Sequence, residues 1–199
     1  AKTGADIILT GGITDEATAF SSSSGVIEPG LEALSSQDSD VTLTVNDKVN
    51  MAQFSDIDAS TSVSVVLTGG ISDEAVNLAD TSGSLSTDFS AATTQDSDVA
   101  VTITSGSGIT DANAAQISAV AGITSGAVTA SIAGDYATVN ALTNTDTNDA
   151  ITVTVTDAIS VSEFNTLNAK TGTDVILTGG MSDEAVNLAD TSGSLSTDF

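Results

Sequence analysis

Histidine, cysteine, arginine and tryptophan are missing from this chain of 199 residues, and it has only five phenylalanines and one tyrosine. Without them, Ser-His-Asp and Cys-His nucleophilic centres, imidazole or thiolate metal sites and arginine clamps for phosphoryl groups are excluded. A membrane-spanning helix needs about 20 apolar residues in a row, and the sequence has no such run. We expect a protein that is not an enzyme, with no catalytic residues and no membrane insertion in this segment.

Positive charge is also scarce. Three lysines stand against 27 acidic residues, and the net charge is -24. Nucleic acids and anionic lipids bind basic surfaces, so both are excluded as partners. The hydrophobic fraction of 40% is enough for a core, and the 58 serines and threonines are small or β-branched. This composition favours thin, layered or solenoidal packing over a bulky globular core.

Internal repeats dominate the sequence. The segment Val66–Phe89 (VLTGGISDEAVNLADTSGSLSTDF) recurs with two conservative changes as Ile176–Phe199, and AKTGADIILTGG at Ala1 returns as AKTGTDVILTGG at Ala169. Both ends of the sequence lie inside repeats, so we expect a longer array. We divide the chain into repeat unit 1 (1–64), repeat unit 2 (65–122), repeat unit 3 (123–174) and a partial repeat unit 4 (175–199).

A shorter strand–helix pattern underlies these repeats. Segments with alternating apolar residues, typical of strands, begin near Ile7, Val41, Val63, Val99, Val128, Ile151 and Val175. A short helix is predicted after each one. The expected fold is α/β, a tandem-repeat solenoid of seven strand–short helix coils, because parallel strands need crossovers of about this length. The alternative is a string of β-sandwich-like repeat modules with antiparallel strands.

Capping signals predict two types of helix. In the first, Ser160 and Glu163 form a capping box, and we assign the same pattern to Asn50 with Gln53 and to Thr110 with Asn113. In the second type, which follows each LTGG motif, the predicted N-caps are Ser72, Thr14 and Ser182. Asp73 and Glu74 are then expected in the first helical turn, with Ile71 packed on Val76. Asp135 is the candidate cap in the most divergent copy.

Aspartates at or near the strand starts are the candidate metal ligands. Stacked carboxylates about 4.8 Å apart repel one another and attract a hard cation, and calcium fits such an oxygen-rich site. The candidate calcium ligands are Asp6, Asp38, Asp40, Asp96, Asp98, Asp146, Asp149 and Asp174. A ladder with Asp149 beside Asp174 is one such arrangement. The alternative is that these aspartates are turn residues whose side chains accept hydrogen bonds from nearby backbone amides.

Other side chains have structural interpretations. The five phenylalanines are expected to pack between strand and helix. They are Phe20, Phe54, Phe89, Phe164 and Phe199. No N-glycosylation acceptor is present, and exposed serines and threonines are candidates for O-linked glycans.

Two segments, DAITVTVTDAISVSEFNTLNAKTG and AVTASIAGDYATVNALTNTD, resemble the repeats of very large bacterial, especially cyanobacterial, surface and matrix proteins. The resemblance implies an extracellular, cell-surface or matrix location and a role in adhesion, motility or fibre formation. It carries no functional residues to this chain.

Two functions remain at this point. The first is a structural repeat segment that assembles with copies of itself, end to end or laterally, into a filament or fibre. Near-identical copies favour it, because equivalent surfaces related by one operation form open helical assemblies. The second is the monomeric stalk of a calcium-dependent adhesin.

Overall fold

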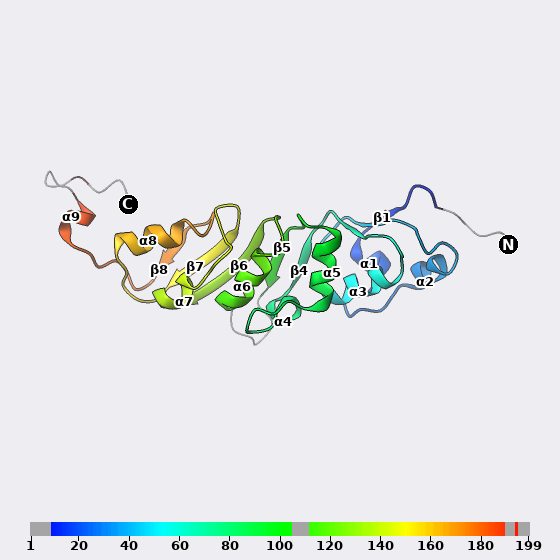
Figure 1. The fold of residues 1–199 in the computed structure, drawn as a ribbon, viewed down its shortest axis with the longest axis horizontal. Coiled ribbons are helices and arrows are strands. Elements are labelled where there is room, and N and C mark those ends of the chain that lie inside the picture. The colour runs from blue at the N-terminus through cyan, green and yellow to red at the C-terminus, as the bar shows by residue number, and fades with distance from the viewer. Residues whose placement is uncertain (1–8, 105–111, 190–193, 195–199) are drawn as a thin grey trace.

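The computed structural model describes residues 9–104, 112–189 and 194. The molecule is elongated, and its labelled strands follow one another in chain order along the long axis (Figure 1). The strands of the described residues are β1 (Ile13–Asp15), β2 (Leu43–Val45), β3 (Val66–Leu67), β4 (Ile71–Glu74), β5 (Val101–Thr104), β6 (Val128–Gly134), β7 (Ala150–Val155) and β8 (Val175–Leu177). The helices are α1 (Ala17–Phe20), α2 (Pro29–Ser35), α3 (Met51–Ala59), α4 (Ala75–Leu78), α5 (Thr87–Gln95), α6 (Ala114–Ala121), α7 (Tyr136–Asn140), α8 (Val161–Asn168) and α9 (Ala185–Leu188).

The strands form two parallel sheets in sequence order, β1-β2-β3 and β4-β5-β6-β7-β8. Within each sheet, every strand pairs with the next one along the chain, with partners such as Ile13 with Leu43 and Val153 with Val175. A parallel bridge between Val49 and Ile71 continues the pairing from one sheet to the next. We call each paired strand segment, together with the helices that follow it, a βα unit. The alternative of β-sandwich modules requires antiparallel sheets, so it does not describe this structure.

The core lies between the inward face of the strands and the helices. Residues of β7 alternate strictly, so that Ile151, Val153 and Val155 are buried while the residues between them are partly exposed. The prediction for the phenylalanines is confirmed for Phe20, Phe54 and Phe89, which are buried. Phe164 packs against the core while partly exposed; Phe199 lies outside the described residues.

The predicted caps of the longer helices are confirmed, with one correction. Ser160 with Glu163 and Asn50 with Gln53 form reciprocal capping boxes, and the side chain of Asp135 caps α7. The prediction for α6 is wrong in its register, because the capping box joins Asn113 to Gln116 rather than Thr110 to Asn113. The observed register buries Ile117 and Val120 on the inward side of α6.

The helix predicted directly after LTGG is wrong. Ser72 does not cap a helix but lies in β4, which continues to Glu74, and α4 is a single turn whose N-cap makes no side-chain bond. Thr14 lies likewise in β1, and Ser182 donates its amide to the Ile159 carbonyl as a paired strand would. Val76 is 55% exposed, so it is not packed under Ile71.

The reason lies in the strand pairing on both sides of the motif. Ile71 bridges Val49 in the preceding unit and pairs with Val101 in the following one. These backbone bonds hold the chain extended past the glycines. Gly70 adopts φ +81°, and a Cβ built on Gly69 would collide with the Asp47 backbone, so the tight approach of the two units requires glycine at both positions.

Candidate functional site

At four junctions, an aspartate side chain joins a βα unit to the helix of the preceding one. The carboxylate of Asp73 accepts a hydrogen bond of 2.7 Å from the backbone N–H of Met51, the first residue of α3. The same bond recurs at three other junctions. The distances are 2.6 Å from Ala17 N to Asp47, 2.9 Å from Tyr136 N to Asp157, and 2.9 Å from Val161 N to Asp183. We call Asp47, Asp73, Asp157 and Asp183 the junction aspartates.

At three of these junctions, in α3, α7 and α8, the aspartate complements a side-chain cap within its target helix, whereas α1 has no side-chain cap of its own. The first turn of a helix leaves four backbone amides without an intrahelical acceptor. In α3, Asn50 accepts from the Gln53 amide at 2.9 Å, and Asp73 of the next unit takes the Met51 amide. Two different side chains therefore satisfy two amides of one helix end. A carboxylate is well suited there, because the helix dipole places partial positive charge at the N-terminus.

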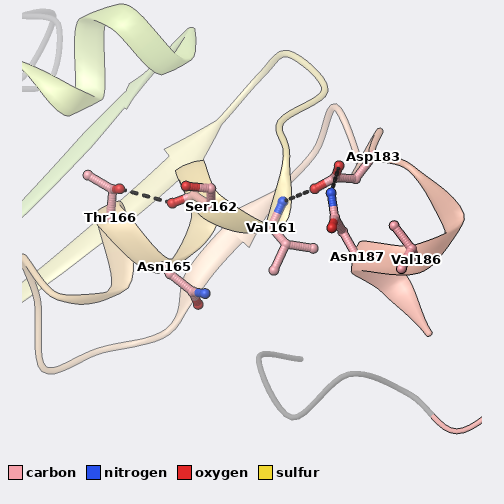
Figure 2. Close-up of a pocket in the computed structure, with 7 residues that line it drawn as sticks. All are labelled: Val161, Ser162, Asn165, Thr166, Asp183, Val186 and Asn187. Carbon is pink, nitrogen blue, oxygen red and sulfur yellow. Dashed lines mark hydrogen bonds between the residues drawn. The ribbon is translucent and has the colours of Figure 1, made fainter. Parts of the chain in front are cut away.

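Asp73 and Asp183 bind on both sides of the junction. The second carboxylate oxygen of Asp183 accepts from the Glu184 amide at 2.8 Å and from the Asn187 side chain at 2.7 Å, and Asp73 makes the same pair of bonds. Figure 2 shows Asp183 between the Val161 amide on one side and Asn187 on the other. Donation from Asn187, Val161 and Glu184 holds the pKa of Asp183 below its ordinary value.

A groove opens beside each of these two aspartates. Between α8 and α9 it has a volume of about 660 Å³, and its walls include Val161, Asp183 and Val186. The equivalent groove between α3 and α4 has a volume of about 500 Å³. Residues at equivalent positions of the long repeat line the two grooves. The equivalent pairs are Met51 and Val161, Ala52 and Ser162, Asp73 and Asp183, Val76 and Val186, and Asn77 and Asn187.

Threonine hydroxyls form a second set of hydrogen bonds between units. Thr124 donates to the Val99 carbonyl of the preceding unit at 2.6 Å, and its hydroxyl accepts from the Gly126 amide at 3.0 Å. Thr61 and Thr171 donate in the same way to the carbonyls of Val41 and Ile151, each at 2.6 Å. These bonds tie the chain just before one strand to the preceding strand, β7, or to the residue two positions before β2 or β5.

The capping-box glutamines also reach the preceding unit. The amide of Gln116 donates to the Ala79 carbonyl at 2.9 Å, and that of Gln53 donates to the Ser21 carbonyl at 3.0 Å. Both side chains are buried. Each glutamine therefore satisfies its own helix and a neighbouring loop at once, which fixes the position of one unit on the next.

The lysines of the described residues donate hydrogen bonds to uncharged acceptors in other units. Lys170 donates to the backbone carbonyls of Asn140 and Leu142, next to the end of α7, and burial lowers the pKa of its ammonium. Lys48 donates to the Thr102 hydroxyl at 2.8 Å. The aspartates, threonines, glutamines and lysines of the junctions all form hydrogen bonds to other parts of the chain. These bonds cap helices and hold neighbouring units together. The absence of enzymatic activity stays a prediction.

The structure brings some of the candidate calcium ligands together in pairs. Asp38 lies beside Asp40, and Asp96 lies beside Asp98 in the following repeat unit. Donation from the Leu9 amide is the main cause that lowers the pKa of Asp38, with help from Asp40. In the second pair, burial and the neighbouring carboxyl of Asp98 raise the pKa of Asp96.

The remaining candidates are more dispersed. Asp149 is buried and accepts a hydrogen bond of 3.1 Å from the Asp146 amide, which is the bonding of a turn residue. It also accepts one of 2.8 Å from the Val128 amide at the start of β6, in the preceding unit. Asp174 is exposed, and the pairing of Val153 with Val175 places it out of register with Asp149. The predicted ladder of these two carboxylates is therefore wrong. Asp6 lies outside the described residues. Within the described ranges, no group of three or more acidic side chains is arranged to hold a metal ion.

The sequence did not predict that the junction aspartates accept hydrogen bonds from the preceding unit. A usable signal was present, because Asp47 and Asp157, like Asp73 and Asp183, occupy equivalent positions of the long repeat and stand in or after a strand. Local capping rules assigned Asp73 to its own helix and gave Asp47 and Asp157 no role. The bonded amides belong to the preceding unit, far beyond the three-residue reach of such rules.

Comparison with models of known protein families, with curated proteins and with solved structures found no match. No helix in the described part of the chain has the length and apolar character of a membrane span.

Proposed function

We propose that this chain is a segment of an α/β solenoid whose function is structural. The observation that carries the proposal is the repeated junction, in which a carboxylate of one βα unit caps the helix of the unit before it. Contacts of this kind link only nearest neighbours, and an array held by them extends without a fixed end. Sequential parallel strands and the elongated shape of the molecule support the same conclusion (Figure 1).

The larger protein builds an extracellular filament or matrix fibre from such segments. Two observations favour a polymer over a single rod. Val66–Phe89 and Ile176–Phe199 are nearly identical, so the array presents equivalent surfaces along its length. The junction chemistry is also directional, because carboxylates point toward the preceding unit and helix amides toward the following one. The extracellular location rests on the resemblance to bacterial surface and matrix repeats.

Negative-stain electron microscopy of the purified native protein tests this function, and diffraction from oriented samples tests the solenoid. We expect ordered fibres, with a reflection at about 4.8 Å along the long axis from the spacing of the parallel strands. Isolated thin rods with the same reflection would instead support a monomeric adhesin stalk. Compact particles without an axial reflection at this spacing would contradict the solenoid itself.

Calcium stays a prediction, with the pairs Asp38–Asp40 and Asp96–Asp98 as its best-placed ligands. Chelation of the native protein should lower its Tm and loosen its fibres if calcium bridges these pairs. Unchanged Tm and fibre integrity after chelation would show that the carboxylates act as turn residues alone. O-linked glycans are a separate prediction, and mass spectrometry of the native protein tests it.

A further inference from the structure

The capping boxes of α3, α6 and α8 come in two chemical versions. In α3 and α6 an asparagine is paired with a glutamine, and in α8 a serine is paired with a glutamate. Both versions cap their own helix in the same way, since the two side chains exchange bonds with each other's backbone amides. Capping within the helix therefore does not explain the difference. The pairs are Asn50–Gln53, Asn113–Gln116 and Ser160–Glu163.

The units that precede α3 and α6 carry a closed loop. Residues 21–27 follow α1 and residues 79–85 follow α4, and each segment is closed by an antiparallel bridge between its first and last residues. We call these two segments the hairpin loops. The unit that precedes α8 is built differently. There α7 leads to β7 through residues 141–149, all of which the structure describes, without an antiparallel bridge.

The asparagine–glutamine pairs bind the hairpin loops through their side-chain amides. In α3, Gln53 donates to the Ser21 carbonyl and Asn50 donates to the Ser23 carbonyl, each at 3.0 Å. A serine hydroxyl and an ionised carboxylate offer no amide for such carbonyls. The version of the box therefore follows the presence of a loop. The equivalent bonds in α6 run from Gln116 to Ala79 at 2.9 Å and from Asn113 to Thr81 at 3.1 Å.

Burial makes the two versions hard to exchange. Gln53 and Gln116 are only 4% and 6% exposed, whereas Glu163 is half-buried. A carboxylate in place of Gln53 would lose the bond to the Ser21 carbonyl and would turn a buried negative charge toward that oxygen. A glutamine in place of Glu163 would keep an oxygen for the cap, and at a half-buried position its amide can meet water.

We propose that these capping pairs select which kind of unit precedes a helix. The asparagine–glutamine pair accepts a unit with a hairpin loop, and the serine–glutamate pair accepts a unit without one. This inference rests on the proposed structural function and names the residues that set the order of the units. Nearly identical repeats, such as Val66–Phe89 and Ile176–Phe199, offer many equivalent strands for pairing, and misassembly between repeats is their characteristic failure. A wrong neighbour buries a carboxylate beneath a loop or leaves loop carbonyls without donors.

Exchanging the acid and the amide in the full chain tests the selection. At pH 7, Gln53→Glu should lower the Tm by at least about 4 °C, because a buried bond is replaced by a repulsive contact. Glu163→Gln, the reverse exchange in α8, should change the Tm by no more than about 2 °C. Ser55→Glu adds the same charge at an exposed position of α3 and should also stay within about 2 °C. Equal and opposite shifts for the two exchanges would show a difference in capping strength alone and would overturn the proposal.

Acid provides a second readout, because protonation turns the introduced carboxyl into a donor for the Ser21 carbonyl. Burial raises the pKa of this carboxyl above the ordinary value of about 4.3. Asp56, which accepts from the Ser21 hydroxyl at 2.8 Å, and Asp73 at the Met51 amide place further negative charge at the same contact. The loss in Tm is therefore present above the raised pKa and shrinks as the pH falls through it.

Between pH 7 and pH 4.5, the difference in Tm between Gln53→Glu and the unmodified chain should fall by at least half. If this variant is unfolded at pH 7, circular dichroism should show that it folds on acidification, which is the same result. Gln116→Glu should repeat both effects at the second hairpin loop. A Tm difference that does not change with pH would overturn the proposal. Unaltered variants together with ordered fibres in micrographs would refute the selection alone, whereas compact particles would refute the proposed function.

Discussion

Removing the carboxylate of Asp73 is the sharpest test of the junctions. Asp73 accepts three hydrogen bonds, each of 2.7 Å, from the Met51 amide, the Glu74 amide and the Asn77 side chain. Asp73→Ala removes all three and leaves two backbone amides without their acceptor. Loss of a single cap lowers the free energy of unfolding by about 1 kcal/mol, and a hydrogen bond to a charged group contributes about 1.5 to 3 kcal/mol net of its exchange with water. Because Asp73 is only half-buried, water can solvate the freed amides in the variant. We therefore expect Asp73→Ala to lower the free energy of unfolding by about 2 to 3 kcal/mol.

The neighbouring residue provides the matched control. Glu74→Ala removes the same charge from the same strand, but the side chain of Glu74 makes no capping bond to α4. Thermal unfolding should show a Tm lower by about 4 to 12 °C for Asp73→Ala, at about 2 to 4 °C per kcal/mol for a chain of this size. Glu74→Ala should change the Tm by no more than about 2 °C.

Hydrogen exchange localises the effect. The Met51 amide, which belongs to the preceding unit, should exchange faster in Asp73→Ala than in Glu74→Ala. If both variants lower the Tm equally, or if Met51 stays protected in Asp73→Ala, the carboxylate does not hold the junction. The reasoning about directional stacking would then fail with it.

Three further predictions concern other parts of the junctions. In urea unfolding, Gly69→Ala should lower the free energy of unfolding by about 3 kcal/mol or more, because its Cβ would collide with the Asp47 backbone. The control, Gly30→Ala in the open first turn of α2, should be neutral or stabilising. In the same assay, Thr124→Val should lower the free energy of unfolding by about 1 to 2 kcal/mol, because it leaves the buried Val99 carbonyl without its donor. Thr42→Val, at an exposed position, should have no such effect. Donors hold the pKa of Asp183 and Asp135 below the ordinary value, so their contribution is present above about pH 4 and is lost as the pH falls through the lower folded values. Acid unfolding followed by circular dichroism should therefore begin below about pH 4, and a smaller acid-induced loss of stability is expected for Asp183→Asn.

The parts of the fold that depend on neighbours in sequence could be predicted. The capping boxes of α3 and α8 join residues three apart, so the pairs Asn50–Gln53 and Ser160–Glu163 are visible in the sequence itself. Alternation of valine, isoleucine and threonine likewise predicted β7, because one face of that strand is buried.

The parts that depend on the neighbouring unit could not be predicted from local rules. Ser72 followed by two acids has the composition of a helix start, yet strand pairing of Ile71 with Val49 and Val101 outweighs that preference. The predicted carboxylate ladder failed for a related reason. Whether Asp149 lies beside Asp174 depends on a register that is set by loop lengths and by packing of the following unit, not by the residue before the strand.

The placement of the aspartates also explains how so acidic a chain can stack at all. A carboxylate in water repels neighbouring carboxylates. A carboxylate that accepts hydrogen bonds from the amides of a helix N-terminus instead faces the partial positive charge of that helix end. Asp73 and Asp183 each meet amides from two units, so negative charge at these junctions is attractive between units. The same chain keeps acids off the outward face of β6, where no helix amides are available to balance them. Negative charge therefore lies where the helix backbone offsets it along the stacking direction.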